Sequence, residues 1–355
     1  MKLINSIKKM PIKMIVSKRP GGKVSNCNYL IKKNGEVLIK PFINPKELYV
    51  QSHGSGTIGK TWKNHHSSFF NLIKPYLKKN IIEIGAGDNS VLHKIKSFNN
   101  IEKFWSVGKN ISIKNKKIKS IDSFFDEKII NQFKVDKCQL AIHSHLFEHI
   151  HNPNTFLQNI YKCLNENGYH IFSIPNMQKM IQRGLANAVN FEHPYYYDEK
   201  LVNVLLKNNG FEIKKVKYFG KCHSIMFITK KIKKFANIKY KNFKSNFKLF
   251  SKLFNKWDGD VIKIKKSFQN KNTYLFGGHV FSQVVIAKGK INNTIPILDN
   301  DKNKHNKYLY GTYNKIRSPE IIKNVKSPYI YLRAGEYDKE IKAQLKKINK
   351  SVKFI

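Results

Sequence analysis

Between residues 79 and 230 the chain alternates short apolar runs with segments of helical pattern. This alternation is typical of βαβ units, in which parallel strands form one sheet and helices cover its faces. A short GKCH turn separates the last two predicted strands, so they run antiparallel and the sheet ends in a reversed hairpin. The predicted strands are NIIEI (80–84), IEKFWSV (101–107), KKIKSI (116–121), QLAIHS (139–144), YHIFSI (169–174), FEIKKVKYF (211–219) and SIMFITK (224–230).

Two helices in this region have recognisable ends. Asn152 is a natural N-cap before Pro153, and apolar residues then recur at helical spacing until Gly168 ends the pattern. Asp198 caps a second helix in the same way, and Gly210 ends it.

A second, smaller α/β unit is predicted from residue 273, beginning with the strand in TYLFGGHVF. Residues 231–272 before it combine many lysines with apolar residues at helical spacing. We interpret this segment as an amphipathic connector between two domains, with a helix lying on a membrane surface as the alternative.

Glycines and polar residues follow two of the predicted strands. Gly85 and Gly87 in GAGDNS come directly after the first strand, where a backbone without side chains can approach a ligand. Such a loop fits a dinucleotide or S-adenosylmethionine (SAM), and Asn89 and Ser90 replace the third glycine that a dinucleotide loop needs. The fourth strand ends in HSHLFEHIHNP, at the edge where open α/β sheets bind ligands.

No metal site is expected. Glu148 and His149 are adjacent rather than four residues apart, which is poor spacing for chelation on a helix. The four cysteines form no CxxC pair. The metal-like side chains weighed at this strand end are His143, His145, Glu148, His149 and His151.

These two strand ends, with CLNENGYHIFSIPN at 163–176, resemble the class I SAM-dependent methyltransferases. The resemblance implies an α/β fold with a Rossmann-like seven-stranded sheet and a reversed last strand, and SAM as cofactor. The second strand ends in Gly108 and Lys109, where that family has an acidic residue for the SAM ribose. The cofactor-binding residues that the resemblance implies are Glu83, Gly85, Ala86, Gly87, Ser123, Phe124, Ser144, His145 and Leu146.

Further segments resemble the sugar C-methyltransferases, which act on nucleotide-linked deoxyketosugars. They are INPKELYVQSHGSGTIGKTWKNHH (43–66), FEHPYYY (191–197), FGGHVFSQVVIAKG (276–289), ILDNDKNKHNKYLYGT (297–312) and IRSPEIIKN (316–324). The resemblance implies four segments: a degenerate N-terminal segment at 1–66, the methyltransferase core at 67–231, a helical connector at 232–272 and a C-terminal Rossmann-like domain at 273–355. Only Cys27 precedes residue 79, so the N-terminal zinc module of that family is expected to be lost.

In FEHPYYY, the matched residues Glu192, His193 and Tyr196 are the implied catalytic residues. Methyl transfer requires removal of a proton from the acceptor, and an imidazole titrates near neutral pH. We therefore expect His193 to accept the proton, with Tyr196 helping to position it and His145 facing it from the fourth strand. Asn190 and Phe191 depart from the family pattern just before this segment, and His279 replaces a glycine of the C-terminal turn.

The chain has 66 Lys and Arg against 23 Asp and Glu, a formal net charge of +43. Almost all the excess is lysine, as an AT-rich coding sequence would produce, whereas nucleic-acid readers rely on arginine. The charge favours an acidic ligand, so the expected partner is a sugar or nucleotide-sugar. We expect the protein to have no membrane span and to be located in the cytoplasm. A methyltransferase or binding protein for nucleic acid is the main alternative, and a structural subunit that has lost its cofactor is a third.

Overall fold

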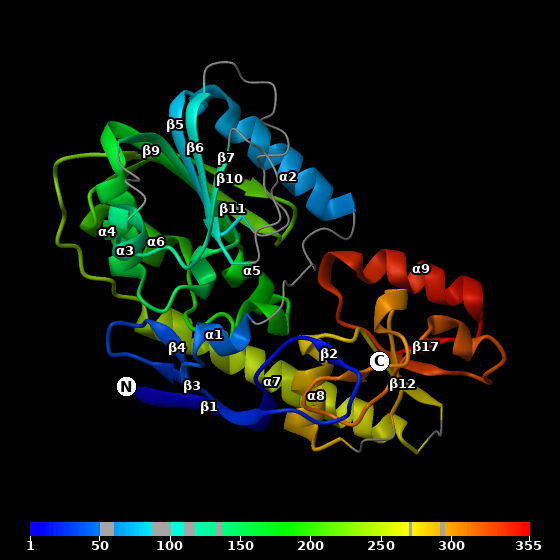
Figure 1. The fold of residues 1–355 in the computed structure, drawn as a ribbon. Helices are drawn as coiled ribbons and strands as arrows, with labels where there is room; N and C mark the ends of the chain where they lie inside the picture. Colours follow the sequence, from blue (N-terminus) through cyan, green and yellow to red (C-terminus); the bar gives the residue numbers. More distant parts are fainter. Residues whose placement is uncertain (50–59, 87–100, 110–117, 133–136, 270–271, 292–294) are drawn as a thin grey trace. The chain divides into compact units, whose positions relative to one another are not determined.

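We describe residues 1–49, 60–86, 101–109, 118–132, 137–269, 272–291 and 295–355 of a computed structural model (Figure 1). The chain divides into two compact units, each built from separate segments. The first unit contains residues 1–44, 177–196 and 241–355, and the second contains residues 45–176 and 197–240. Each unit is described below by itself, and the four-segment division made from the sequence stays a prediction.

The second unit contains a seven-stranded sheet, in the order β10-β11-β9-β8-β5-β6-β7. Strands β9, β8, β5, β6 and β7 pair in parallel, and β11 pairs antiparallel with both β9 and β10. This is the predicted class I Rossmann-like sheet with its reversed strand, so the predicted fold class is confirmed. The strands are β5 (Lys79–Ile84), β6 (Ile101–Gly108), β7 (Ile118–Asp122), β8 (Cys138–Ser144), β9 (Leu164–Pro175), β10 (Phe211–Phe219) and β11 (Ser224–Lys231).

Helices cover both faces of this sheet (Figure 1). On one face, Phe69 and Ile73 of α2 (Lys60–Ile73) pack on a core of Ile81, Leu140 and Ile171. Side chains alternate between the faces of a strand, so His143 and Phe172 lie on the other face, where the ring of Phe156 in α4 lies 5.4 Å from that of His143. The helices of this unit are α1 (Pro45–Leu48), α2, α3 (Glu127–Gln132), α4 (Pro153–Cys163) and α6 (Glu199–Asn208).

Both predicted helix starts and one of the two predicted helix ends are confirmed, since α6 ends at Asn208 and Gly210 follows its C-cap with a φ of +80°. The Asn152 side chain accepts a hydrogen bond from the Thr155 N–H, and Asp198 accepts one from the Leu201 N–H at 2.7 Å, so both N-caps are confirmed. The expected end of α4 at Gly168 is wrong, because the helix stops at Cys163 and Leu164 already pairs with Cys138 in the sheet. Lys231 donates to the carbonyl oxygens of Tyr161 and Leu164, which satisfies acceptors at the end of the helix.

The N-terminal part of the first unit is an antiparallel three-stranded sheet in the order β1-β3-β4, formed by β1 (Lys2–Pro11), β3 (Val24–Ile31) and β4 (Val37–Lys40). A separate short ladder joins β2 (Val16–Ser17) to β14 (Tyr308–Leu309). Cys27 is buried in β3, and burial raises the pKa of its thiol to about 12. A thiol that is held protonated is a poor metal ligand, because metals bind the thiolate.

The predicted lysine-rich helix is α7 (Phe243–Ser267), and its apolar face is buried inside the first unit. Phe254 packs edge-on against Tyr29 of β3, and the Trp257 Nε1–H donates to the Gly184 carbonyl oxygen at 2.9 Å, just after α5 (Met177–Gln182). The apolar stripe is therefore a protein-packing surface. Among the described residues, no helix is long and apolar enough to cross a membrane.

The C-terminal part of the first unit contains a five-stranded parallel sheet, in the order β15-β13-β12-β16-β17. Strand order reverses beside β12, as in doubly wound nucleotide-binding sheets. Its strands are β12 (Thr273–Phe276), β13 (Ile297–Leu298), β15 (Ile316–Arg317), β16 (Tyr329–Tyr331) and β17 (Lys353–Phe354), and its helices are α8 (Val280–Gly289) and α9 (Asp338–Ile348). The second, smaller α/β domain predicted from residue 273 is confirmed as a fold.

Candidate active site

The turn after β5 is built around Gly85. Its φ is +71°, a conformation that favours glycine, and its N–H donates to the Val107 carbonyl oxygen at 2.6 Å. A Cβ at this position would stand 2.8 Å from the Leu146 side chain. The turn is therefore held between β6 and the end of β8, and a side chain at this position would be strained by its backbone and would have to displace Leu146. Gly87, the second predicted glycine, and the predicted helix after it lie outside the described residues.

Two further predicted cofactor-binding residues, Glu83 of β5 and Ala86 of the turn, are buried. Glu83 lies in the middle of the sheet between Ser106 of β6 and Ile142 of β8, and it is 4% exposed. Ala86 is also buried and directly follows Gly85. A close backbone approach continues at Gly108, where a Cβ would stand 3.3 Å from the Ala86 nitrogen. Three neighbouring strand segments thus form a compact cradle at the carboxyl edge of the sheet.

The end of β8 is fixed to β9. The hydroxyl groups of Ser144 and Ser173 lie 2.8 Å apart, and the His145 N–H donates to the Ser173 carbonyl oxygen. His145 has a φ of +50°, which turns the chain sharply after the strand. The structure therefore brings Ser144, His145 and Leu146 to the same edge as Gly85, and their predicted role in binding SAM stays a prediction.

The end of β6 carries no acidic residue. Gly108 ends the strand and pairs with Asp122 of β7, and the Lys109 ammonium lies 3.4 Å from the Asp122 carboxylate. The predicted cofactor residues Ser123 and Phe124 follow Asp122 directly, and the Lys109 ammonium lies 5.9 Å from the Phe124 ring. The family's acidic residue for the SAM ribose would stand at Gly108 or Lys109. The sheet register places the Asp122 carboxylate of β7 beside this position.

The predicted catalytic residues lie in the first unit, on a segment tied to β4. The Tyr196 N–H donates to the Val37 carbonyl oxygen, and Ile39 donates in turn to Pro194. His193 is 9% exposed, and its Nδ1 lies 3.3 Å from the Ala188 carbonyl oxygen. Glu192 and Tyr196 are more deeply buried, with Tyr196 packed edge-on against Phe250 of α7. The catalytic roles of these three residues, and the approach of His193 toward His145, stay predictions.

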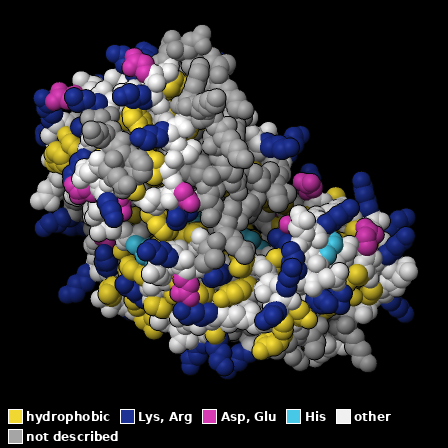
Figure 2. Space-filling model, in the orientation of Figure 1, with side chains coloured by type: hydrophobic (Ala, Val, Ile, Leu, Met, Phe, Trp, Pro, Cys, Tyr) yellow, Lys and Arg dark blue, Asp and Glu magenta, His cyan; other side chains and the backbone are white. Residues whose placement is uncertain are grey.

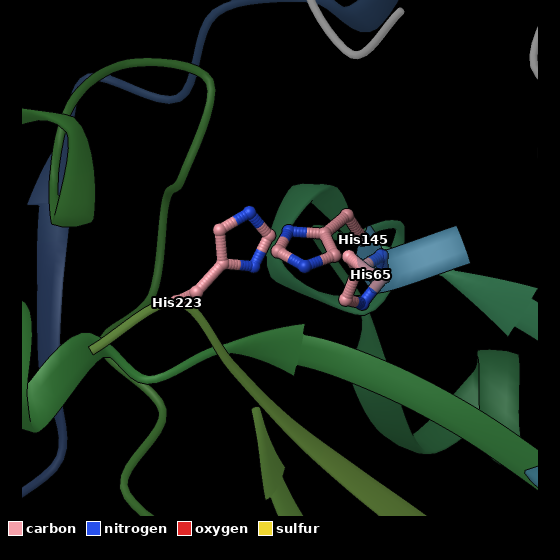
Figure 3. Close-up of side chains that lie close together, drawn as sticks. All are labelled: His65, His145 and His223. Carbon is pink, nitrogen blue, oxygen red and sulfur yellow. The ribbon is translucent and has the colours of Figure 1, made fainter. Parts of the chain in front are cut away.

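Three histidines from distant parts of the sequence meet within the second unit (Figure 3). His65 comes from α2, His145 from the end of β8, and His223 from the turn between β10 and β11. Each offers one ring nitrogen, and these atoms all lie within 4.8 Å of one another. The Trp62 ring packs against this cluster, with centroids 4.9 Å from His145 and 4.6 Å from His223. We call His65, His145 and His223 the histidine cluster.

Burial keeps His65 and His145 neutral. Loss of water contact, followed by repulsion from neighbouring imidazoles, lowers the pKa of His65 and of His145 well below the usual range. The His145 Nδ1 lies 3.3 Å from the Glu148 carboxylate, and its Nε2 lies 2.8 Å from the Ser224 hydroxyl. Burial raises the pKa of Glu148 to about 7. Both ring nitrogens of His65 are buried without a hydrogen-bond partner among the described residues.

The sequence analysis singled out His145 but not His65 or His223. His65 is 80 residues before His145 and His223 is 78 residues after it, so no local spacing connects them. The signal for His65 in the sequence is its position on the apolar face of α2, one turn before Phe69, where a polar side chain is unexpected.

Comparison with known proteins gives one family match. A methyltransferase domain family matches residues 65–216. No curated protein matches the chain.

Solved structures share parts of the fold at low identity. A SAM-dependent methyltransferase from Mesorhizobium loti is 10% identical, with 50% of this chain and 100% of that one covered and a TM-score of 0.37. A SAM-dependent methyltransferase from Aquifex aeolicus is 12% identical, with 46% and 89% covered and a TM-score of 0.35. The 1,6-didemethyltoxoflavin-N1-methyltransferase of Burkholderia thailandensis is 12% identical, with 57% and 99% covered and a TM-score of 0.39.

The family match covers strands β5 to β9 and part of β10, with the Gly85 turn and the end of β8, and ends before β11. The chain therefore contains a class I SAM-dependent methyltransferase domain, it is a SAM-dependent methyltransferase, and SAM is its cofactor.

Proposed function

We propose that this enzyme transfers the methyl group of SAM to a sugar or sugar nucleotide, at a carbon beside a ketone or at a hydroxyl, in surface-glycan or deoxysugar synthesis. The observation that carries the proposal is the second parallel sheet in the same chain. In enzymes of this fold SAM binds at the carboxyl edge of the methyltransferase sheet. The C-terminal sheet is therefore available to an acceptor that carries a nucleotide. The FEHPYYY and C-terminal segments, which resemble the sugar C-methyltransferases, support the same acceptor class.

The C-terminal sheet supports a role in acceptor binding rather than in binding its own dinucleotide. A dinucleotide needs an open glycine turn and an acidic side chain at the end of the next strand. Here Asp299, which follows β13, already accepts a hydrogen bond from the Gly278 N–H at 2.7 Å and pairs with Lys304 at 3.1 Å. His279 stands at the third position of the turn. The Gly278 N–H and the Asp299 carboxylate, two groups that a dinucleotide would use, thus already have partners in the chain.

SAM supplies an electrophilic methyl group that is displaced in line by the acceptor, so the protein has to orient the acceptor and remove one proton. His193 is the proposed proton acceptor. Its Nδ1 lies within hydrogen-bonding distance of the Ala188 carbonyl oxygen, and an N–H at this atom makes Nε2 the basic nitrogen. Tyr196 and Glu192 hold the segment in place through their burial.

The positive charge supports an acidic acceptor such as a nucleotide diphosphate. On the face drawn in Figure 2, the Lys and Arg side chains are dispersed among other residues. Nucleic acid, the alternative acceptor, is favoured only by the net charge of +43. The four cysteines are thiols rather than disulfides, which fits the proposed work in the reducing cytoplasm.

The test is a transfer assay with methyl-labelled SAM and three acceptor sets: nucleotide-linked ketosugars, nucleotide sugars without a ketone, and nucleic acids. We expect label in a sugar nucleotide. His193→Ala should lower turnover by about 10²–10⁴-fold with SAM affinity unchanged. The matched control is His305→Ala, another histidine of the first unit, which should keep turnover. Label only in nucleic acid would contradict the acceptor, and full activity in His193→Ala would contradict the base.

A further inference from the structure

The histidine cluster has the composition of a transition-metal site. Neutral imidazole is the common ligand of zinc, and three imidazoles with one open position form a catalytic type of zinc site. The cluster lies wholly within the second unit and depends on no described contact with the first.

His65 gives an independent reason to expect a ligand. It is fully buried, yet neither ring nitrogen has a hydrogen-bond partner among the described residues. A buried polar group without a partner is costly, so nearly all such groups in folded proteins are satisfied. The other two rings lie 5.1 Å from that of His65, centroid to centroid, so His65 faces the groups with which it could share an ion.

The surroundings of His145 match the arrangement found around metal-bound histidines. In such sites the second ring nitrogen donates to a carboxylate, which fixes the ring orientation and increases the basicity of the ligand. Glu148 stands 3.3 Å from the His145 Nδ1 and is 1% exposed. This leaves Nε2 of His145 for the ion, at the side where the Ser224 hydroxyl lies 2.8 Å away. The ion would replace this hydroxyl at Nε2 of His145, while the contact of the same hydroxyl with the His223 Nδ1, at 2.6 Å, orients the His223 ring.

We propose that His65, His145 and His223 bind one divalent transition-metal ion of the zinc class, with its fourth position open to an oxygen ligand. Ligand nitrogens of a tetrahedral zinc ion lie about 3.3 Å apart, as follows from Zn–N bonds of about 2.0–2.1 Å. The present separations reach 4.8 Å, so binding draws the rings together through small side-chain rotations. The Trp62 ring against the cluster limits access of water.

The position of the site suggests what the open coordination position holds. His145 directly precedes Leu146, whose side chain touches the Gly85 turn. The ion would therefore stand at the cofactor edge of the same sheet, where it can polarise a hydroxyl or carbonyl oxygen of the acceptor as a Lewis acid. This role rests on the proposed function, whereas metal binding itself does not.

The experiment uses the full chain without a histidine tag, stripped of metal and titrated with Zn²⁺ and with Co²⁺. We expect one ion per chain and a visible Co²⁺ spectrum of tetrahedral type. His65→Gln and His223→Gln should each weaken binding by at least about 100-fold, and Glu148→Gln by about 10–100-fold. The matched control is His151→Gln, from the same strand-end segment as His145 but outside the cluster, which should bind as the wild type does.

SAM affinity, measured on every variant, separates the metal proposal from the methyltransferase assignment and verifies that each variant folds. Normal SAM binding with no metal uptake by the wild type would overturn the site. Unchanged metal affinity in both His65→Gln and His223→Gln would overturn it as well. A wild type that binds the metal but transfers no methyl group to any sugar nucleotide contradicts the proposed function and leaves the metal site supported.

Discussion

The methyltransferase sheet and the C-terminal sheet each have a glycine turn after a strand, β5 and β12 respectively. The two regions differ in whether nearby buried polar groups have hydrogen-bond partners. In the C-terminal sheet, the Asp299 carboxylate is satisfied by Gly278 and Lys304 of its own unit. In the methyltransferase unit, His65 of helix α2 stays buried with both ring nitrogens unmatched among the described residues. Polar groups that the chain satisfies itself are structural, whereas an unmatched buried group points to a ligand. The unmatched His65 therefore points to a ligand at the histidine cluster of the methyltransferase unit.

The largest expected effect comes from the two glycines that follow β5 and β12. Gly85→Val places a branched side chain at a φ of +71° and against Leu146, so we expect SAM affinity to fall by at least about 1,000-fold, or about 4 kcal/mol. Gly277→Ala is the control, because its φ is +99° but its Cβ meets nothing within 4 Å. It should leave SAM binding intact. Calorimetric titration with SAM measures both, and equal losses would remove the distinction between the two turns.

A second prediction concerns ion pairs in the two units. In the first unit, Arg333 makes two hydrogen bonds to the Asp260 carboxylate of α7, at 3.0 and 2.5 Å, and Asp260 is buried. Arg333→Met leaves that carboxylate without its cation, so the free energy of unfolding should fall by about 3 kcal/mol. Lys162→Met breaks the exposed pair with Glu127 in the second unit and should cost below about 1 kcal/mol. Urea denaturation compares them, and similar costs would contradict the prediction.

A third, smaller effect is acid sensitivity of the methyltransferase sheet. Burial lowers the pKa of His170 to about 3, against about 6.5 in an unfolded chain. The unfolded state therefore binds the proton more readily, so the stabilising contribution is complete above pH 6.5 and declines as the pH falls toward 3. Between pH 6.5 and 5 the loss amounts to roughly 2 kcal/mol.

His170→Gln removes this titration and keeps an amide that can donate to His143, whose Nε2 lies 2.9 Å from that of His170. The variant should lose roughly 2 kcal/mol less unfolding free energy than the wild type between pH 6.5 and 5. Between pH 7 and 8 the two should behave alike. Hydrogen exchange would locate the acid-sensitive opening, and an opening confined to the C-terminal sheet would refute this assignment.

The methyltransferase sheet could be predicted from the sequence because its strands are buried on both faces. Ile81, Ile82 and Ile84 of β5, for example, are all buried, so the apolar residues of this strand do not alternate with exposed ones, and the intervening Glu83 is buried as well. The reversed hairpin followed from the length of the turn between Phe219 and Ser224. The end of α4 could not be predicted in this way, because pairing of Leu164 with Cys138 competes with helix continuation and is a long-range interaction.

The candidate site shows the same limit. Gly85 and His145 follow strands, and their strand-end positions identified them. His65 lies on a helix and His223 in a hairpin turn, and only the folded sheet brings either within reach of His145. Gly87 lies outside the described residues, so its predicted contact with SAM remains a prediction.

The path of the chain has a consequence for synthesis on the ribosome. Val16 and Ser17 pair with Leu309 and Tyr308, and the Gln283 side chain of α8 donates to the Lys13 carbonyl oxygen. Residues that are synthesised early therefore complete their contacts only after residues near 309 have been synthesised. The methyltransferase sheet, by contrast, is complete once residue 231 has emerged. Nascent chains should therefore acquire the methyltransferase unit first, while β2 stays without its partner strand and exposed to chaperones until β14 has emerged.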